Sequence, residues 1–187
     1  MTKPLRVFVA LPVPDDVVRA VDQRVGALRD RYPDLRWARP GGWHVTLAFL
    51  GDIPEGEVDT AREAVAAAVE ETGSGAIELT VGEAGHFNRR VLWLGVEDQP
   101  SGAVARLGSA MQAAISSAGL PCDQKSVHPH LTLARTRGRS RLPRDITDDV
   151  PYVEATWTAD AVEVLSSQLG EGGSRYEVLA EVTLIGG

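Results

Sequence analysis

The chain has 187 residues, of which 43% are hydrophobic and 24% are charged, and this balance is typical of a soluble globular protein. The length predicts a single domain over residues 1–187, made of two small lobes that share a core. The net charge of −7 argues against a general, strong affinity for nucleic acid, and a single cysteine, Cys122, excludes an internal disulfide and fits a reducing cytoplasm.

The N-terminal stretch MTKPLRVFVALPVP has a weak likeness to a signal peptide, because Lys3 and Arg6 precede a short apolar run. The run is interrupted at Pro12 and no small-residue cleavage site follows, so the sequence favours a buried strand over residues 5–11. No apolar run in the chain reaches 18 residues, which predicts no transmembrane helix. The expected location is the cytoplasm.

Three segments, 14–33, 54–73 and 101–119, carry apolar residues at helical spacing. In the first, Asp15 and Asp16 suit the start of a helix, where carboxylates are favoured. The three apolar stripes consist of Val17, Val21, Val25 and Leu28; of Val58, Ala61, Val65 and Val69; and of Val104, Leu107, Met111 and Ile115. The pattern predicts three amphipathic helices that pack outside a sheet.

The segments between these helices have the composition of strands and loops. Residues 33–40 are expected to form a loop, residues 77–87 and 90–97 two strands joined through Asn88 and Arg89, and residues 152–169 and 175–184 extended structure. The glycine-rich segment 170–175 has the composition of a phosphate cradle, but no helix pattern follows it, so a hairpin loop is expected. The resulting order predicts an α+β fold with two antiparallel-rich sheets flanking a central cleft, arranged as two pseudo-symmetric lobes.

Two remaining strands carry the same pattern, His-x-Thr-Leu-Ala. The first copy begins at His44 and is followed by Gly51 and Asp52, and the second begins at His130. Because side chains alternate along a strand, each histidine shares a face with its threonine, about 6.6 Å along the backbone. Thr46 therefore accompanies His44, and Thr132 accompanies His130. Two such strands facing each other would form a small polar cleft.

This set of side chains suits acid–base chemistry on a phosphate ester. The ordinary histidine pKa of about 6.5 allows one ring to be neutral while another is protonated, so that one takes a proton from water and the other gives one to a departing oxygen. Threonine hydroxyls can donate hydrogen bonds to phosphate oxygens, on which negative charge develops during attack. The scheme requires no metal and no cofactor.

The chain resembles the two-histidine (2H) phosphoesterase superfamily, and within it the bacterial RNA 2′,3′-cyclic phosphodiesterases. The likeness rests on RVFVALPVPDDV, RWARPGGWHVTLAFLGD, RVLWLGVE, HPHLTLAR and LSSQLGEGGSRYEVL. It implies metal-independent hydrolysis of a 2′,3′-cyclic phosphate, on RNA or on a nucleoside, to a 2′-phosphate. It further implies His44 as proton donor, His130 as proton acceptor, and Thr46 and Thr132 as phosphate-binding hydroxyls. The substrate is the expected partner, and no obligate protein partner is inferred.

Arginines follow the second motif without any acidic residue between residues 135 and 144. They are Arg135, Arg137, Arg139, Arg141 and Arg144. Such a block either binds phosphate or forms a solvated loop, and the sequence leaves both interpretations open. The family resemblance favours Arg135 as a phosphate contact, and Tyr176 is a further candidate for lining the cleft.

The other aromatic residues and histidines have ordinary structural interpretations. His128 is expected in a loop, and His86 at a strand end. Phe49 and Trp93 are expected in the core. Trp43 either stacks on a base or packs in the core, and the sequence does not decide between these.

Three alternatives to hydrolysis remain open. Four histidines could bind zinc, although no His-x-x-x-His pair and only one cysteine are present. The same cleft could bind RNA ends without turnover, or could catalyse 2′–5′ RNA ligation, which is the reverse of 2′–5′ cleavage.

Overall fold

The computed structural model describes residues 4–170 and 173–185. Lys3 and part of the glycine-rich segment 170–175 lie outside the described residues. The helices are α1 (Asp15–Arg31), α2 (Val58–Thr72), α3 (Ala103–Ser117) and α4 (Ile146–Asp149), with single 3₁₀ turns η1 (Pro40–Gly42) and η2 (Glu55–Glu57). The strands are β1 (Leu5–Pro12), β2 (Arg36–Trp37), β3 (His44–Ile53), β4 (Ile77–Phe87), β5 (Val91–Gln99), β6 (His130–Arg135), β7 (Thr156–Ala159), β8 (Ala161–Gly170) and β9 (Gly173–Thr183).

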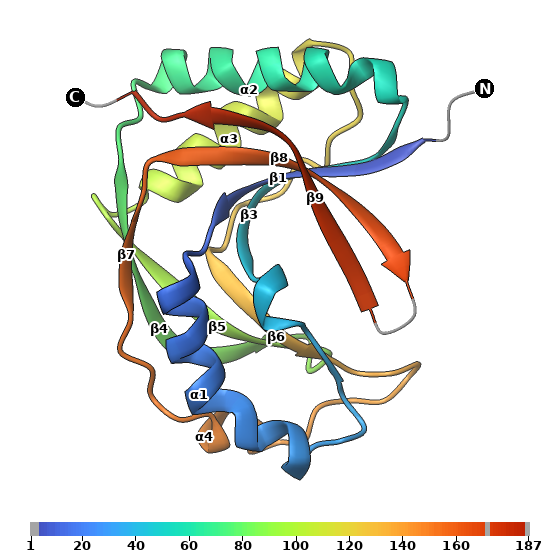
Figure 1. Cartoon of the computed structure of the whole chain (residues 1–187), viewed down its shortest axis with the longest axis vertical. Helices are drawn as coiled ribbons and strands as arrows, with labels where there is room; N and C mark the ends of the chain where they lie inside the picture. The colour runs from blue at the N-terminus through green and yellow to red at the C-terminus, as the bar shows by residue number, and fades with distance from the viewer. Residues whose placement is uncertain (1–3, 171–172, 186–187) are drawn as a thin grey trace.

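The strands form two antiparallel sheets, which confirms the predicted α+β class (Figure 1). The first sheet has the order β3-β1-β8-β9 and the second has the order β2-β6-β5-β4-β7. The first motif therefore lies on an edge strand of the first sheet, and the second motif lies inside the second sheet. The two motif strands, β3 and β6, contact each other where the sheets meet.

The helices bury the stripes that the sequence predicts, except that Val58 at the start of α2 is only half-buried, and Figure 1 shows α2 and α3 together on one face of the first sheet. There α2 packs against β9 and α3 packs against β3. The end of α1 is joined to α4, because Tyr32 donates a hydrogen bond to the Asp149 carboxylate and Arg31 forms an ion pair with it at 2.9 Å. Within the described residues, no helix has the length and apolarity needed to span a bilayer.

Three details differ from the sequence-based expectation. The loop between Pro33 and Pro40 contains a two-residue strand, β2, and a single-turn helix, α4, follows the arginine block. The segment 152–169 is not one extended element, because β7 belongs to the second sheet and β8 to the first. Asp160 marks the change of sheet, and its carbonyl accepts a hydrogen bond from the Leu184 amide at 2.8 Å.

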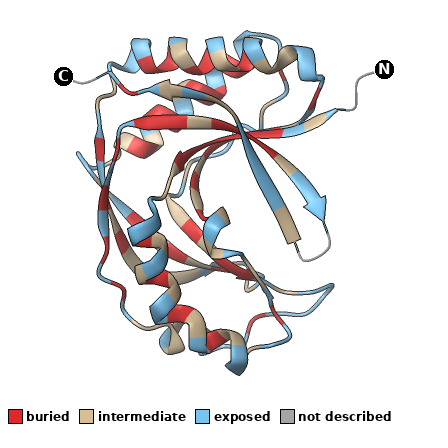
Figure 2. Ribbon diagram, viewed as in Figure 1, coloured by how far each residue is buried: buried red, intermediate tan, exposed pale blue. Residues whose placement is uncertain are grey.

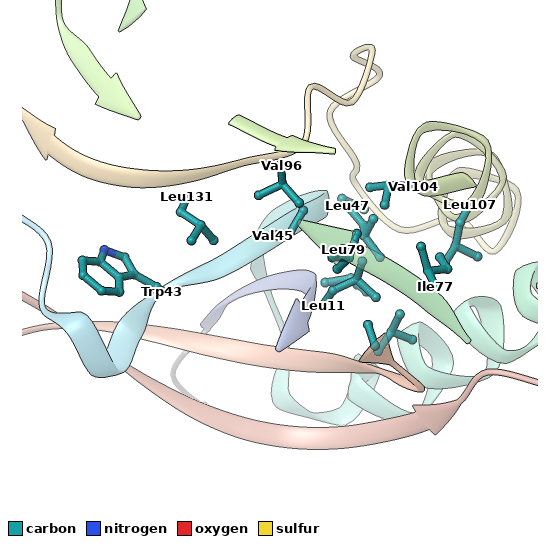
Figure 3. Close-up of a cluster of buried hydrophobic side chains, with 14 of the residues drawn as sticks. Leu11, Trp43, Val45, Leu47, Ile77, Leu79, Val96, Val104, Leu107 and Leu131 are labelled. Atoms are coloured by element: carbon teal, nitrogen blue, oxygen red, sulfur yellow. The ribbon is translucent and has the colours of Figure 1, made fainter. Parts of the chain in front are cut away.

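A continuous hydrophobic cluster joins the two sheets and the helices. It includes Val45 and Leu47 of the first motif strand and Leu131 of the second, and these residues lie together in Figure 3. Figure 2 shows buried positions along the strands of both sheets. Trp43, only 6% exposed, belongs to this cluster, so of its two interpretations the structure supports packing in the core.

Candidate active site

A cleft of about 960 Å³ lies between the two motif strands, and all four motif side chains line it. His44 and Thr46 line it from β3, and His130 and Thr132 line it from β6. The alternation expected from the sequence therefore holds within each His-x-Thr triplet. The four polar groups share one solvent-accessible space, as acid–base chemistry on a bound ester requires.

The Leu-Ala part of the repeat forms a β-bulge in the first motif strand. Along β1, Val9 pairs with Ala48, and the next residue, Ala10, pairs with Thr46. Leu47 is therefore skipped, so that the alternation of faces shifts by one residue. Leu47 and Ala48 are both buried, although they are consecutive.

The second motif strand has a bulge at the equivalent place. Along β5, Leu92 pairs with Ala134, and Trp93 pairs with Thr132, so that Leu133 is skipped. Leu133 and Ala134 are again both buried. Leu-Ala therefore occurs in both motif copies at the position of a bulge. This explains why the two copies are alike beyond the histidine and the threonine.

The bulges turn the next residue of each strand back towards the cleft. Phe49 pairs with Phe8, and Arg135 pairs with Val91, and all four residues line the cleft. Paired residues of an antiparallel sheet share a face. The expectation that Phe49 lies in the core is therefore wrong, because strict alternation does not account for the bulge. We call Phe49 and Arg135, each five residues after a motif histidine, the +5 residues.

The backbone carbonyls of the two skipped residues, Leu47 and Leu133, both have hydrogen-bond partners. The Leu47 carbonyl accepts a hydrogen bond from the buried Gln112 side chain of α3 at 3.0 Å. The Leu133 carbonyl accepts one from the Ala38 amide, just after β2, at 2.8 Å. Buried backbone groups without partners are costly, so these bonds stabilise the bulges.

The two histidine rings are held in the same way. His44 Nδ1 lies 2.7 Å from the Gly42 carbonyl, and His130 Nδ1 lies 2.6 Å from the His128 carbonyl. A carbonyl can only accept, so Nδ1 carries the proton in both rings. Nε2 is then the nitrogen of each ring that is available to take or give a proton.

Aromatic side chains surround His44. The ring centroids of Phe8 and Tyr176 lie 4.7 Å and 5.2 Å from that of His44. Burial is the main cause that lowers the pKa of His44 to about 4, and electrostatic repulsion from His130 and Arg135 lowers it further. Tyr176 lines the cleft, as the sequence suggests, and its ring also lies against Gly42.

A second aromatic group surrounds His130. Phe87 and Trp93 lie with ring centroids 5.0 Å and 6.2 Å from His130, and the exposed His128 ring packs 4.8 Å from Trp93. Trp93 is only partly buried and lies against these rings, so the expectation that it lies in the core is wrong in part. Burial is again the main cause that lowers the pKa of His130, with added repulsion from His128 and Arg135. His128 lies before β6, in a loop as predicted.

Arginines line the cleft from the side of the second sheet. Arg36 of β2 pairs directly with Arg135 of β6, and Arg137 follows. Arg139, Arg141 and Arg144 are not among the lining residues, so the arginine block contributes in part. Arg36 and Arg39 line the cleft although no sequence signal singles them out, because β2 is recognisable only through its distant partner strand.

His86 is exposed and accepts a 3.3 Å hydrogen bond at Nδ1 from the Arg89 amide, at the β4–β5 turn.

Across residues 4–170 and 173–185, no three His, Cys, Asp or Glu side chains gather as they would around a metal ion. The zinc alternative therefore finds no donor set in this part of the chain.

Comparison with known proteins identifies relatives over nearly the whole chain. The family model described as the 2′-5′ RNA ligase superfamily matches residues 14–171. A Geobacillus stearothermophilus protein named RNA 2′,3′-cyclic phosphodiesterase is 26% identical over 96% of this chain, which spans 57% of that protein. A Thermotoga maritima protein of the same name is 27% identical, over 98% of this chain and 97% of that protein.

Solved structures share the fold. The Thermus thermophilus protein TT0787 superposes with a TM-score of 0.76 at 24% identity, covering 97% of this chain and 99% of that one. Escherichia coli LigT in complex with 3′-AMP superposes with a TM-score of 0.73 at 22% identity, with the same coverage. At 24% and 22% identity, these two matches show that the fold is shared and nothing further.

Proposed function

Because the chain belongs to the 2′-5′ RNA ligase superfamily, we propose that it hydrolyses 2′,3′-cyclic phosphates, on RNA ends or nucleosides, to 2′-phosphates. The observation that carries the proposal is the pair of histidines in one cleft, each with Nδ1 bound to a carbonyl and Nε2 available for proton transfer. The names of the two bacterial relatives support the same activity.

In the proposed reaction, neutral His130 takes a proton from a water molecule at Nε2, and the water oxygen forms a bond to phosphorus. The bond from phosphorus to the 3′ oxygen breaks on the opposite side, and His44 gives its Nε2 proton to that oxygen. The products are a 3′ hydroxyl and a 2′-phosphate. The direction, with His44 as donor, follows the family resemblance.

The other lining residues bind the charge of the phosphate. Thr46 and Thr132 donate hydrogen bonds to non-bridging oxygens, where negative charge grows in the transition state. Arg135 supplies a positive charge beside them, and Tyr176 bounds the site next to His44. All of these groups come from the protein, and the proposed reaction uses no metal or cofactor.

The lowered pKa of His44 makes its protonation dependent on the substrate. With a pKa of about 4, the ring is neutral near pH 7 in the free protein. A bound phosphate carries negative charge into the cleft, and this charge favours the protonated ring. The proton that His44 donates is therefore taken up together with the substrate.

The decisive experiment is product analysis with 2′,3′-cyclic AMP. We expect 2′-AMP, separated by chromatography from authentic 3′-AMP, and we expect the same rate after exhaustive chelation. Predominant 3′-AMP would reverse the assigned leaving oxygen. Activity lost with chelator and restored by a divalent ion would support a metal-dependent reaction.

Ligation at the same site is the second candidate, and the family name favours it. RNA ending in a 2′,3′-cyclic phosphate, incubated with RNA bearing a 5′ hydroxyl, would yield a 2′–5′ linkage. Binding of RNA ends with neither hydrolysis nor ligation would leave the non-catalytic alternative.

We propose a cytoplasmic location, a single two-lobed domain and no obligate protein partner.

A further inference from the structure

Helix α3 reaches both halves of the cleft from behind. Its residues Gly108 and Gln112 are four positions apart, so they lie one turn apart on the same face of the helix. Both are buried, and α3 packs against the first motif strand, β3. The described residues that line the cleft include none of α3. Any effect of this helix face on the reaction must therefore pass through other residues.

The first half of the cleft is reached at the bulge of β3. The Gln112 side chain donates a hydrogen bond to the Leu47 carbonyl at 3.0 Å, and a Cβ atom on Gly108 would lie 3.2 Å from the same carbonyl oxygen. The helix can approach the bulge this closely because residue 108 has no side chain. Leu47 directly follows Thr46, so this helix face fixes the backbone beside the Thr46 hydroxyl.

The second half is reached through the connecting segment, residues 120–129, which runs from the end of α3 past β3 to β6 (Figure 1). Before His130 it contains no helix or strand, and most of its residues are exposed. Its position therefore depends on a few contacts. The Asp123 amide donates a hydrogen bond to the Phe49 carbonyl at 2.9 Å. The Lys125 amide donates one to the side-chain oxygen of Gln112 at 3.0 Å.

The end of the connecting segment orients the His130 ring. The His128 carbonyl lies 2.6 Å from Nδ1 of His130. The residue before His128 is Val127, which lies against α3, since a Cβ atom on Gly108 would be 2.5 Å from Val127 Cγ2. The residue after it is Pro129, whose carbonyl accepts a 3.0 Å hydrogen bond from an amide of β5. The His128 carbonyl is therefore placed between α3 and β5.

We propose that Gly108 and Gln112 are positioning residues, which set the placement of the two halves of the cleft relative to each other. Gln112 uses both groups of its buried amide, because the donor holds Leu47 in the first half and the acceptor holds the segment that leads to the second. Gly108 leaves room for the Leu47 carbonyl and for Val127. The inference rests on the proposed function for the reaction that the two halves perform.

This role predicts a loss in kcat rather than in KM. Proton transfer needs both Nε2 atoms at hydrogen-bond distance from the reacting oxygens, and a displacement of about 1 Å can cost ~10²-fold in rate. The side chains that bind the phosphate stay in place within each half. A change in the placement of the halves should therefore affect the chemical step most.

The first test is steric. Gly108→Ala brings a methyl group against Val127, and Val127→Ala removes the methyl group that it meets. We expect Gly108→Ala to lower kcat on 2′,3′-cyclic AMP by ~10-fold or more, with KM changed by less than about threefold. The double variant Gly108→Ala, Val127→Ala should recover most of the loss, and Val127→Ala alone should match wild type. An unchanged kcat in Gly108→Ala, or a loss that the double variant does not recover, would overturn the inference.

The second test removes the hydrogen bonds and keeps the volume. Gln112→Met leaves the Leu47 carbonyl and the Lys125 amide without their partner, so kcat should again fall while KM changes little. The control is Met111→Ala on the same helix, because Met111 is fully buried but has no hydrogen-bond donor for either half. We expect it to lower stability and to leave kcat per folded molecule unchanged. Equal losses of kcat per folded molecule in both variants would mean that α3 contributes only stability, contrary to the inference.

Titration of the histidine rings by NMR gives a readout that a role in stability alone would not change. Burial and the charges of His128 and Arg135 lower the pKa of His130, whereas the hydrogen bond from Nδ1 to the His128 carbonyl raises it. In Gly108→Ala we expect the pKa of His130 to fall further as this bond weakens. The pKa of His44 should stay unchanged, because its carbonyl partner belongs to η1.

The titration also separates this inference from the proposed function. A wild-type protein without activity on 2′,3′-cyclic phosphates would contradict the proposed function, while a selective change at His130 in Gly108→Ala would still support the positioning role. An active wild-type protein whose kcat and histidine pKa values are all unchanged in Gly108→Ala would contradict the inference alone.

Discussion

His44 and His130 are set up alike, each by a carbonyl two residues earlier, so removing either ring should have a large and similar effect. We expect His44→Ala and His130→Ala to reduce turnover of 2′,3′-cyclic AMP by ~10²–10⁴-fold, the usual contribution of an acid–base group. Both rings lie at the cleft rather than in the main core, so circular dichroism should show a folded protein. Near-normal turnover in either variant would remove that histidine from the chemistry.

The lowered pKa values of the two rings predict an acidic optimum for kcat/KM, which reports on the free protein. The active form needs one neutral and one protonated ring, so the profile is a bell whose two limits belong to the coupled pair. Because both pKa values lie below 6.5 in the free protein, kcat/KM should fall above that pH. Bound phosphate raises the pKa values, so the alkaline limit of kcat should lie at higher pH. Both kcat and kcat/KM should be measured from pH 4 to pH 9. The two profiles would have the same alkaline limit if the substrate did not affect the pKa values of the rings.

The exposed guanidinium of Arg135 should matter more for binding than for chemistry when the substrate carries RNA. We expect Arg135→Ala to raise KM for an oligonucleotide ending in a cyclic phosphate, and we expect the difference from wild type to shrink at high salt, since salt screens exposed charges. Arg144→Ala is the control, because this arginine is exposed outside the cleft. If salt changed KM to the same extent in Arg135→Ala and in wild type, the arginine segment would be a solvated loop that does not contact the substrate.

At the scale of elements, the turn η1 fixes how the β8–β9 hairpin meets the first motif. A Cβ atom on Gly42 would lie 2.9 Å from Tyr176 Cε2, whereas one on Gly41 would meet no atom within 4 Å. We expect Gly42→Ala to push the Tyr176 ring away from His44 and to lower kcat/KM, with the pKa of His44 rising towards its ordinary value as burial decreases. Gly41→Ala should match wild type in both. Equal behaviour of the two variants would mean that Tyr176 has no influence on His44.

Sequence patterns predict the regular elements of this fold well and the irregular ones poorly. The stripes of α1, α2 and α3 and the shared faces of His44 with Thr46 follow from periodicity alone, which is a local property. The place of Phe49 does not, because the bulge at Leu47 depends on pairing with β1 and on the Gln112 side chain far along the chain. The strand β2 escapes prediction for the same reason, since two residues carry no period and only β6 defines them.

For the molecule as a whole, the continuous core predicts that the two sheets unfold together. Trp43 and Trp157 are both 6% exposed, so tryptophan fluorescence reports on the interior. Circular dichroism reports on the helices. We expect a single denaturant transition with the same midpoint by both probes, as for a two-state protein. Two separated transitions would show that the lobes have independent stability, contrary to the single domain that we propose.

The paired bulges also bear on how chains of this design can change over time. A substitution at a +5 residue alters one wall of the cleft, but the backbone keeps its path. Deleting Leu47 or Leu133 would remove the bulge at that residue and turn the residues that follow it to the opposite face. We therefore expect no insertion or deletion between each motif histidine and its +5 residue, whereas substitutions at the +5 residue are compatible with the same backbone. New substrate preferences can arise on this backbone by point mutation, without any change in the length of either motif strand.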